Sequence, residues 1–339
     1  MVFAGAFATF SRRNNRQRGR GYTVFVSLIM AVVMSACSQP DWCESESAEA
    51  LRARNVTALP YATVHELLSV GPDDPIALFA HRGGIDCAER DGAPENSISN
   101  VKKAIRMGFD GYETDLWTTV DGEFLINHDH TLDRSTTGTG EVAAITFAES
   151  RGLRLKYPSG NVSTEQMPTL RELLTAGQGR ILFLVELKGG SAERFTDLIS
   201  IAREAGALDH VLFWIDWTAE RATLFEQHLN SGIQEVRTNV MWRARSLQAL
   251  EDIVQRFDPI MVDLPPSYFE LRWQRRLNLF PKKHLALVDT AHKLGVKVLV
   301  SKVTKNSHVD VLQSKGVRVF MSRAPEVQLT YLIANGLHH

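Results

Sequence analysis

Four short segments of this sequence carry side chains that bind metal ions, transfer protons or hold anions. The segments are His81-Arg82, Glu113 with Asp115, His128 with Asp129, and Glu186 with Lys188. The imidazole pKa lies near neutral pH, so two histidines can divide the removal and donation of a proton. Three carboxylates supply the oxygen ligands that Ca²⁺ and Mg²⁺ prefer. The residue types therefore predict a site for one divalent cation beside a proton-transfer pair.

Each group also has an ordinary structural interpretation when it is taken alone. His81 by itself is more typical of a hydrogen-bonded structural histidine than of a catalyst. Glu113 and Asp115 are two residues apart and point to the same side of a strand, either as a water-facing pair or as a metal site. Glu186 and Lys188 are also explained by an ion pair at the end of a buried strand. A site is favoured because all four groups follow consecutive predicted strands.

Short apolar runs alternate with helix-period segments from residue 76 onward. Strands are predicted at Ile76–Ala80, Gly111–Leu116, Glu123–His128, Ile181–Glu186, Val211–Ile215, Glu235–Val240, Ile260–Leu264, Val296–Ser301 and Val317–Met321. Helices are predicted at Ser97–Met107, Thr169–Ala176, Ser191–Ala205, Thr218–Leu229, Leu247–Phe257 and Leu285–Leu294. Continuous apolar strands separated by helices indicate a parallel sheet covered on both faces. This number of strands favours an α/β fold of the TIM (β/α)8 barrel type, whose chemistry lies at the C-terminal ends of the strands.

A predicted β-hairpin connects His128 to the acidic pair. Asp121-Gly122 is a strong two-residue turn signal between two extended segments. With Val120 opposite Glu123, Asp115 would face His128 directly, with their Cβ atoms about 5 Å apart. A parallel arrangement of this segment would remove that register, although His128 would still reach the mouth of the barrel.

The composition limits the function classes. The chain has 339 residues, and its 38 Lys and Arg residues nearly balance 39 Asp and Glu residues. This balance argues against a nucleic-acid partner held by a basic field. The length suits one large barrel with additional segments. Three cysteines are too few for a disulfide scaffold.

The N-terminal segment predicts export. Residues 11–20 contain five arginines and no acid, and the thirteen residues of Tyr22–Met34 carry no charge, which is typical of a secretory signal. Met34-Ser35-Ala36-Cys37 resembles a bacterial lipobox, so we expect a signal peptide over residues 1–36 and lipidation of Cys37. We expect a tether over 37–75, with a short helix near Ala62–Val70, and the barrel over 76–335. An uncleaved N-terminal anchor is the alternative.

Either alternative makes the protein an exported one on the periplasmic face of a bacterial membrane. Ser38 after Cys37 lacks the aspartate that retains lipoproteins at the inner membrane, which gives a weak preference for the outer membrane. The other two cysteines, Cys43 and Cys87, either pair in that oxidising compartment or stay as free thiols. The expected partners are the membrane, through the lipid anchor, and a small-molecule substrate; no protein partner is inferred.

An ordered set of motifs resembles the glycerophosphodiester phosphodiesterase family over residues 76 to 332. The motifs are His81-Arg82-Gly83, Pro94-Glu95-Asn96-Ser97, Gly108-Phe109-Asp110-Gly111-Tyr112-Glu113-Thr114-Asp115, Asp121-Gly122, His128-Asp129, Leu132-Asp133-Arg134-Ser135-Thr136 and Glu186-Leu187-Lys188. The resemblance implies a TIM barrel of the phospholipase C-like phosphodiesterase type. It also implies one divalent cation, Ca²⁺ or Mg²⁺, and hydrolysis of glycerophosphodiesters to sn-glycerol 3-phosphate and an alcohol.

The same resemblance implies a role for each matching residue. The metal ligands would be Glu113, Asp115 and Glu186, and the general acid/base pair would be His81 and His128. Arg82 and Lys188 would hold the phosphate, with Glu95 lining the site. Attack by the glycerol 2-hydroxyl through a cyclic phosphate and direct attack by water both remain open. The alternative enzymatic function is that of a lyase of the phospholipase C or D kind, which releases the cyclic phosphate. The alternative without catalysis is a surface lipoprotein.

The chain departs from the family pattern after two of its last strands. Leu299-Val300-Ser301-Lys302-Val303 replaces a common Trp-Thr-Val-Asn, and Ser322-Arg323-Ala324-Pro325 replaces Thr-Asp-x-Pro. Lys302 and Arg323 would then lie on one rim, with Arg323 lining the site. This change predicts a more anionic substrate than glycerophosphocholine; the alternative is ordinary variation of a peripheral loop. The charged first loop, Gly84–Ala93, is a candidate lid.

Overall fold

The computed structural model describes residues 41–54, 56, 61–177, 179–266 and 281–338. The predicted signal peptide and Cys37 lie outside this range. None of the described helices combines the length and the apolar character that a membrane crossing requires.

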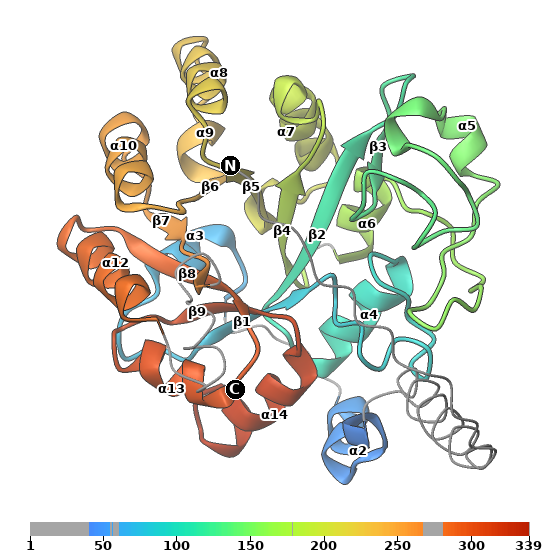
Figure 1. Ribbon diagram of the computed structural model, residues 1–339, viewed down its shortest axis with the longest axis horizontal. Helices are drawn as coiled ribbons and strands as arrows, with labels where there is room; N and C mark the ends of the chain where they lie inside the picture. Colours follow the sequence, from blue (N-terminus) through green and yellow to red (C-terminus); the bar gives the residue numbers. More distant parts are fainter. Residues whose placement is uncertain (1–40, 55, 57–60, 178, 267–280, 339) are drawn as a thin grey trace, which may run out of the picture. The chain divides into compact units, whose positions relative to one another are not determined.

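Eight parallel strands close into a barrel, which confirms the predicted TIM fold (Figure 1). The barrel strands are β1 (Ala77–His81), β2 (Gly111–Thr118), β4 (Leu182–Leu187), β5 (Val211–Asp216), β6 (Val240–Arg243), β7 (Met261–Asp263), β8 (Lys297–Val303) and β9 (Val319–Ser322). They pair in this order, and pairing of β1 with both β9 and β2 closes the ring. The strands are buried on both faces, as their continuous apolar sequences predict.

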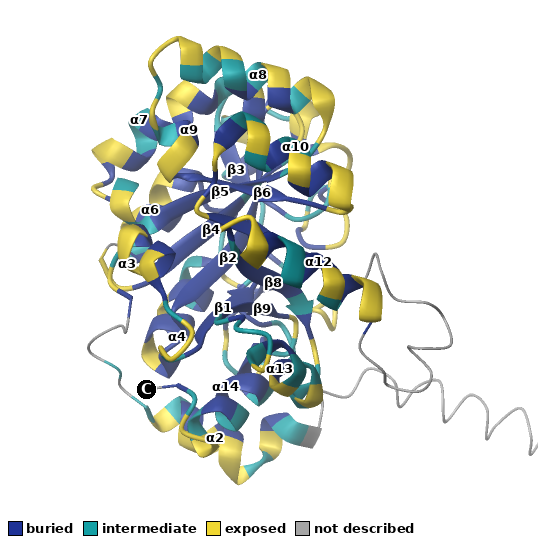
Figure 2. Ribbon diagram, turned by 90° about the vertical axis from the view of Figure 1, so that its left-hand side faces the viewer, coloured by how far each residue is buried: buried dark blue, intermediate teal, exposed yellow. Residues whose placement is uncertain are grey.

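Helices surround the barrel, each with buried residues on one side and exposed residues on the other, as Figure 2 shows. They are α4 (Ile98–Met107), α5 (Phe147–Ser150), α6 (Leu170–Gly177), α7 (Phe195–Glu204), α8 (Ala219–Asn230), α9 (Glu235–Thr238), α10 (Leu247–Phe257), α12 (Lys282–Lys293), α13 (Asn306–Gln313) and α14 (Pro325–Ala334). Short 3₁₀ turns occur at Val142–Ala144, Ala192–Arg194 and Leu208–His210. Ser97 caps α4 by accepting a hydrogen bond from the Asn100 amide, and Gly108 ends it in the left-handed conformation.

The predicted strand at Glu235–Val240 is wrong. Glu235–Thr238 forms the short helix α9, and the strand β6 begins at Val240 and continues to Arg243. Of the four residues of α9, only Val236 is buried, so this polar segment has too little apolar surface for an interior strand. The shift moves Arg243 from a predicted loop to the C-terminal end of a barrel strand.

The hairpin forms, but its predicted register is wrong by one residue. Strand β3 (Phe124–Ile126) pairs antiparallel with β2, with Leu116 opposite Ile126 and Thr118 opposite Phe124. The turn is longer by one residue than a two-residue turn, because Thr119 pairs with Glu123 and Gly122 adopts a left-handed φ of 89°. Asn127, not His128, therefore lies opposite Asp115 and donates its amide to the Asp115 carbonyl at 3.0 Å.

The region expected to be a tether contains folded elements in its described part. The 3₁₀ turn Asp41–Glu44, helix α2 (Glu46–Ala53) and helix α3 (Val64–Ser69) precede the barrel. Leu51 of α2 joins the outer core, and Leu67 of α3 joins the cluster that fills the barrel interior. A disulfide between Cys43 and Cys87 links this arm to the first loop. The amphipathic character of these short helices is thus used for packing against the barrel.

The barrel interior is apolar at one end and charged at the other. Phe79, Leu184, Trp214 and Met321 belong to the interior cluster. A Cβ on Gly111 would lie 2.1 Å from the Phe79 ring, so only glycine fits opposite this ring. Towards the C-terminal ends of the strands, inward-facing positions change from apolar to charged residues, and this end forms the mouth described below.

Candidate active site at the barrel mouth

The strand register brings the predicted site residues together. His81 at the end of β1 lies opposite Glu113 of β2, and Asp115 of β2 lies opposite Glu186 of β4. Neighbouring strands are about 4.8 Å apart, so these pairs place their side chains side by side on the inner face. The three predicted metal ligands and one predicted acid/base histidine thus belong to two rows across three adjacent strands.

The three carboxylates form a compact cluster that fits a divalent cation. Each of Glu113, Asp115 and Glu186 offers an oxygen within 4.8 Å of the others. Glu113 Oε1 is buried and has no hydrogen-bond partner among the described residues. Burial, together with the charges of Asp115 and Glu186, raises the pKa of Glu113 well above its usual range. A hard cation would satisfy the free oxygen and remove this repulsion.

Backbone and amide groups fix the orientation of two of these carboxylates. The Arg82 amide donates to Glu113 Oε2 at 3.0 Å. The Asn96 side-chain amide donates to Asp115 Oδ2 at 3.2 Å, and the Thr114 hydroxyl holds Asn96 from the other side at 2.9 Å. Arg82 and Asn96 both adopt left-handed φ values, of 50° and 57°. Such strain in non-glycine residues is typical of functional sites that the surrounding structure holds in place.

Lys188 and Arg82, the predicted phosphate-binding residues, lie near different oxygens of Asp115. Lys188 Nζ lies 2.7 Å from Asp115 Oδ1 and 3.7 Å from Glu186 Oε2, and donates to the His128 carbonyl at 2.9 Å. Burial opposes the charge of Lys188, but the charges of Asp115 and Glu186 outweigh burial and raise its pKa. Arg82 Nη1 lies 3.3 Å from Glu95 Oε2, which places the predicted site-lining Glu95 against the guanidinium.

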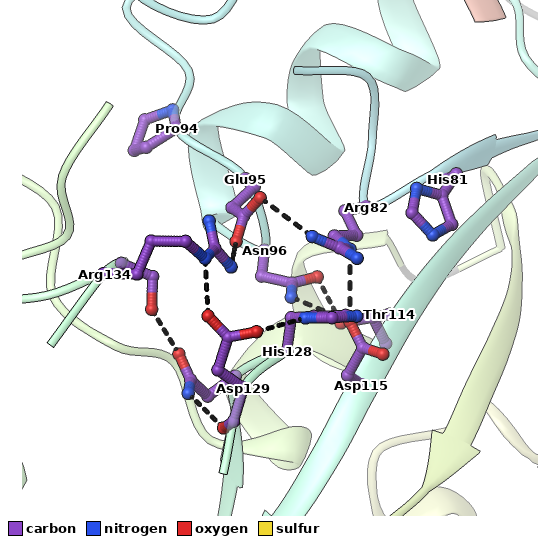
Figure 3. A network of polar contacts seen from close by, with 12 residues as sticks. His81, Arg82, Pro94, Glu95, Asn96, Thr114, Asp115, His128, Asp129 and Arg134 are labelled. Carbon is purple, nitrogen blue, oxygen red and sulfur yellow. Dashed lines mark hydrogen bonds and ion pairs between the residues drawn. The ribbon is translucent and has the colours of Figure 1, made fainter. Parts of the chain in front are cut away.

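The two predicted acid/base histidines have different surroundings, as Figure 3 shows. His81 is buried, with Nε2 at 3.9 Å from Glu113 Oε2. Burial and the positive charges of Arg82 and Arg323 lower the pKa of His81 well below its ordinary value. His128 is more exposed, and its Nδ1 lies 2.6 Å from Asp129 Oδ1. A carboxylate on Nδ1 fixes the orientation of the ring and directs the other ring nitrogen, Nε2, away from Asp129.

Sequence reasoning gave no role to several residues that organise the mouth. Asp129 orients His128, and Arg134 bridges Asp129 to Glu95 (Figure 3). The hydrogen bonds from Arg134 and His128 outweigh burial and lower the pKa of Asp129. Asp129 and Arg134 stood inside the quoted motifs, so their position next to His128 was the available signal.

Arg243 is the largest omission. It is 2% exposed, and its Nη1 lies 3.1 Å from Glu186 Oε1 and 3.0 Å from Asp216 Oδ1. Its Nε lies 3.1 Å from Asp263 Oδ2, and its guanidinium carbon lies 3.4 Å from the centre of the Trp214 ring. Arg243 therefore holds the third carboxylate of the cluster from β6, two strands away from β4.

The first loop is connected to its surroundings at several points. Cys87 is in the disulfide with Cys43, and Arg90 pairs with Glu44 and Glu49 of the N-terminal arm. Beneath the loop, buried Lys103 donates to the Gly84 carbonyl at 3.2 Å. These contacts oppose the large movement that a lid over Gly84–Ala93 would need.

Comparison with known proteins gives a consistent result. Residues 81–326 match the sequence model of the Glycerophosphoryl diester phosphodiesterase family. Bovine glycerophosphodiester phosphodiesterase 1 is 34% identical over 134 residues, which are 38% of each chain. The present chain thus spans little more than a third of that relative. YhdW of Bacillus subtilis is 25% identical over 271 residues, covering 77% of this chain and 98% of that protein.

Solved structures show the same fold. A glycerophosphoryl diester phosphodiesterase from Parabacteroides distasonis has a TM-score of 0.61 at 22% identity, covering 82% of this chain and 93% of that one. An Oleispira antarctica phosphodiesterase, solved in complex with the product sn-glycerol-3-phosphate, has a TM-score of 0.60 at 19% identity and covers 77% of this chain and 97% of its own.

Proposed function

Because the chain belongs to the glycerophosphoryl diester phosphodiesterase family, we propose that it hydrolyses glycerophosphodiesters to sn-glycerol 3-phosphate and an alcohol. The observation that carries this proposal is the cluster of Glu113, Asp115 and Glu186 at the barrel mouth, with His81 beside Glu113 and with the His128 backbone held by Lys188. The product-bound Oleispira antarctica phosphodiesterase, which shares the fold, supports the choice of substrate class.

We propose that one divalent cation, Ca²⁺ or Mg²⁺, is held by the three carboxylates. When bound, this cation would supply positive charge against the phosphate oxygens as negative charge builds on them. The unpartnered oxygen of Glu113 and the repulsion within the cluster support it. Arg82 and Lys188 flank the cluster and would share the phosphate charge, Arg82 as a fork of N–H donors and Lys188 as a point charge.

The two histidines divide the proton transfers. His128 has Asp129 at hydrogen-bond distance from Nδ1, which fixes the orientation of the ring, so we assign to it the donation of a proton to the departing alkoxide. His81, neutral in its buried position among cations, would accept the proton of the attacking hydroxyl. If water is the nucleophile, its oxygen forms the new P–O bond as the bond to the alcohol breaks. If the glycerol 2-hydroxyl is the nucleophile, water then opens the cyclic phosphate. In both routes one proton is taken up by His81 and one is released by His128 as the alcohol departs.

An assay of the full chain tests this function. We expect release of sn-glycerol 3-phosphate from glycerophosphoethanolamine, loss of this activity in EDTA, and recovery on addition of Ca²⁺ or Mg²⁺. His81→Ala and His128→Ala should each lose at least 100-fold in kcat. His65→Ala, an exposed histidine of α3, is the matched control. Activity that survives both active-site substitutions would refute the mechanism, and accumulation of a cyclic glycerophosphate would indicate a lyase instead.

We also propose that the protein is exported and lipidated on Cys37, which anchors it to a bacterial membrane. The Cys43–Cys87 disulfide supports an oxidising compartment for the folded domain. Cys37→Ser should abolish incorporation of radiolabelled palmitate and release the protein from the membrane fraction. A labelled Cys37→Ser variant would contradict lipidation at this residue.

A further inference from the structure

Two basic residues at the barrel mouth are not used by the proposed reaction. Lys302 lies in β8 and Arg323 directly follows β9. Within the described part of the chain, neither side chain takes part in an ion pair or a hydrogen bond. Arg323 is exposed and Lys302 is partly exposed, so both are accessible to a ligand.

The strand register places both residues beside His81. Ser322 pairs with Ala80, so Arg323 comes next to His81 across the β1–β9 boundary. The Arg323 amide also donates to the Val303 carbonyl at 3.3 Å, which ties it to the end of β8. The positive charges of both residues contribute to the lowered pKa of His81, because they disfavour the charged form of its ring. The pair therefore belongs to the same mouth as the cluster.

A β-bulge gives Lys302 its position. Val300 pairs with Phe320 and Val303 with Ser322, so two residues of β8 lie opposite Met321 alone. Ser301 remains fixed to Asp263 by two hydrogen bonds of 3.1 and 3.0 Å. The backbone of Lys302 has a left-handed φ of 62°, a conformation that residues other than glycine rarely adopt. Bulges near active sites re-aim a side chain, and here the strained residue is the basic one.

The acids near Lys302 are already bound elsewhere. Glu186 and Asp263 are the two carboxylates whose charges act on it, and Arg243 binds both. Arg243 and Arg323 add positive charge to the same place and, with burial, lower the pKa of Lys302. The scissile phosphodiester carries one negative charge, for which Arg82, Lys188 and a cation are available. Two further unpaired cations exceed what that group needs.

We propose that Lys302 and Arg323 form a second anion subsite, which binds a phosphate or carboxylate carried by the alcohol part of the substrate. The inference rests on the proposed function, since it names the class of head group that this same site accepts. The ends of the last two barrel strands are also where TIM barrels commonly bind phosphate, next to a helix N-terminus. Here α14 begins at Pro325, two residues after Arg323.

Two matched substrate pairs test the subsite in the full chain. Glycerophosphoserine differs from glycerophosphoethanolamine by one carboxylate, and glycerophosphoinositol 4-phosphate differs from glycerophosphoinositol by one phosphate. We expect kcat/KM to be about tenfold higher for the anionic member of at least one pair, as for a hydrogen-bonded charge pair. The pair with the larger ratio identifies whether the group is a carboxylate or a phosphate.

Two variants connect the ratio to the residues. Lys302→Asn removes the charge and keeps a residue that tolerates the left-handed backbone, and Arg323→Gln removes the second charge. Each should lower the anionic-to-neutral ratio by about threefold to tenfold. Lys293→Gln, at an exposed position in the last turn of α12, changes the net charge equally and should leave the ratio unchanged. Thermal unfolding of each variant identifies a folding defect.

The outcomes separate the two proposals. Equal turnover within both pairs by the unmodified chain would overturn the subsite and leave the phosphodiesterase activity in place. A variant that loses both members of a pair equally would assign the cations to the scissile phosphate and overturn the subsite as well. Failure to cleave any of the four substrates would overturn both the activity and the subsite.

Discussion

The two halves of the barrel mouth treat charge differently. At the ends of β1, β2 and β4, Arg82, Asp115, Glu186 and Lys188 each have an opposite charge within 4 Å, as in the contacts of Asp115 with Lys188 and of Glu95 with Arg82. At the ends of β8 and β9, Lys302 and Arg323 have none among the described residues. Arg243 at the end of β6 lies between the two halves. It binds Glu186 of the first half and Asp263 of β7, which in turn accepts a hydrogen bond from Ser301 of β8.

The charges of the first half are held in place by partners within the protein, whereas Lys302 and Arg323 are available to pair with a ligand. Paired and buried charges lose little entropy on reaction because their geometry already exists, which suits metal binding and proton transfer. Unpaired, accessible cations contribute only when an anion arrives, which suits discrimination between substrates. We therefore expect substitutions in the first half to reduce turnover of all substrates, and those in the second half to change substrate preference.

The largest effect is expected for Glu113→Gln. Glutamine keeps the acceptor for the Arg82 amide but removes a charge from the cluster, so kcat/KM should fall about 10³-fold or more. Because burial and neighbouring acids raise the pKa of Glu113, its ionised form costs stability at neutral pH in metal-free protein. The metal-free variant should therefore unfold at a higher temperature than the unmodified protein, and calorimetry with and without Ca²⁺ or Mg²⁺ measures both effects.

The exposed acid Glu220 of α8 provides the matched control for that substitution. Glu220→Gln should change neither kcat/KM nor the response of the melting temperature to the cation. A Glu113→Gln protein that keeps its cation response would refute the assignment of Glu113 as a ligand.

Asp129→Asn comes next. Asparagine keeps the shape but cannot hold a protonated His128, so kcat should fall about 100-fold while KM changes little. Steady-state kinetics on glycerophosphoethanolamine measure this split. Asp133→Asn, an exposed acid in the same loop, is the control. An equal loss for Asp129→Asn and Asp133→Asn would mean that the loop, and not the His128–Asp129 pair, is responsible.

The sequence was sufficient for the barrel and for one half of its mouth, for a physical reason. Charged residues follow the first four predicted strands, and packing in an apolar core does not account for them. The C-terminal ends of the strands meet at one face of a TIM barrel, so these residues are expected to lie together. Pairing register is harder to predict, because a turn longer by one residue shifts every partner. This is why Asn127 and not His128 lies opposite Asp115.

Arg243 was missed because the fifth barrel strand, β6, was assigned to the wrong segment. The apolar residues of Glu235–Val240 are too few for a strand, yet Val236 and Val240 suggested one, which left Arg243 in a loop. Its partners Glu186, Asp216 and Asp263 are 57, 27 and 20 positions away in the sequence, so no local pattern predicts these contacts. Before residue 76, the predicted short helix near Ala62–Val70 is confirmed by α3. The packing of this region was missed, since it depends on a disulfide and on the surface that the region covers.

Arg243→Lys tests whether Arg243, which lies between the two halves, holds the proposed metal ligand Glu186 in position. Lysine keeps the charge but cannot bridge three carboxylates, so Glu186 should lose its fixed orientation. We expect cation affinity, measured by titration of the EDTA-treated protein, to weaken about 10- to 100-fold, with a smaller loss of kcat at saturating cation. Arg256→Lys, in an ion pair with Glu226 on the outer surface, is the control. A lower melting temperature with unchanged cation affinity would limit Arg243 to stability.

The smallest effect on catalysis is expected for removal of the Cys43–Cys87 disulfide, which joins the arm to the loop of the first half. The bond closes a loop between residues 44 positions apart, so the paired substitutions Cys43→Ser and Cys87→Ser should lower the free energy of unfolding by about 2–4 kcal/mol. Glu95 is held separately by Arg82 and Arg134, so kcat should change less than about twofold. Urea unfolding and kinetics on one preparation measure both, and dithiothreitol should affect only the unmodified protein. A large fall in kcat without the disulfide would mean that the geometry of the first half depends on the N-terminal arm. The contacts that hold the charges of this half in place would then include residues outside the barrel.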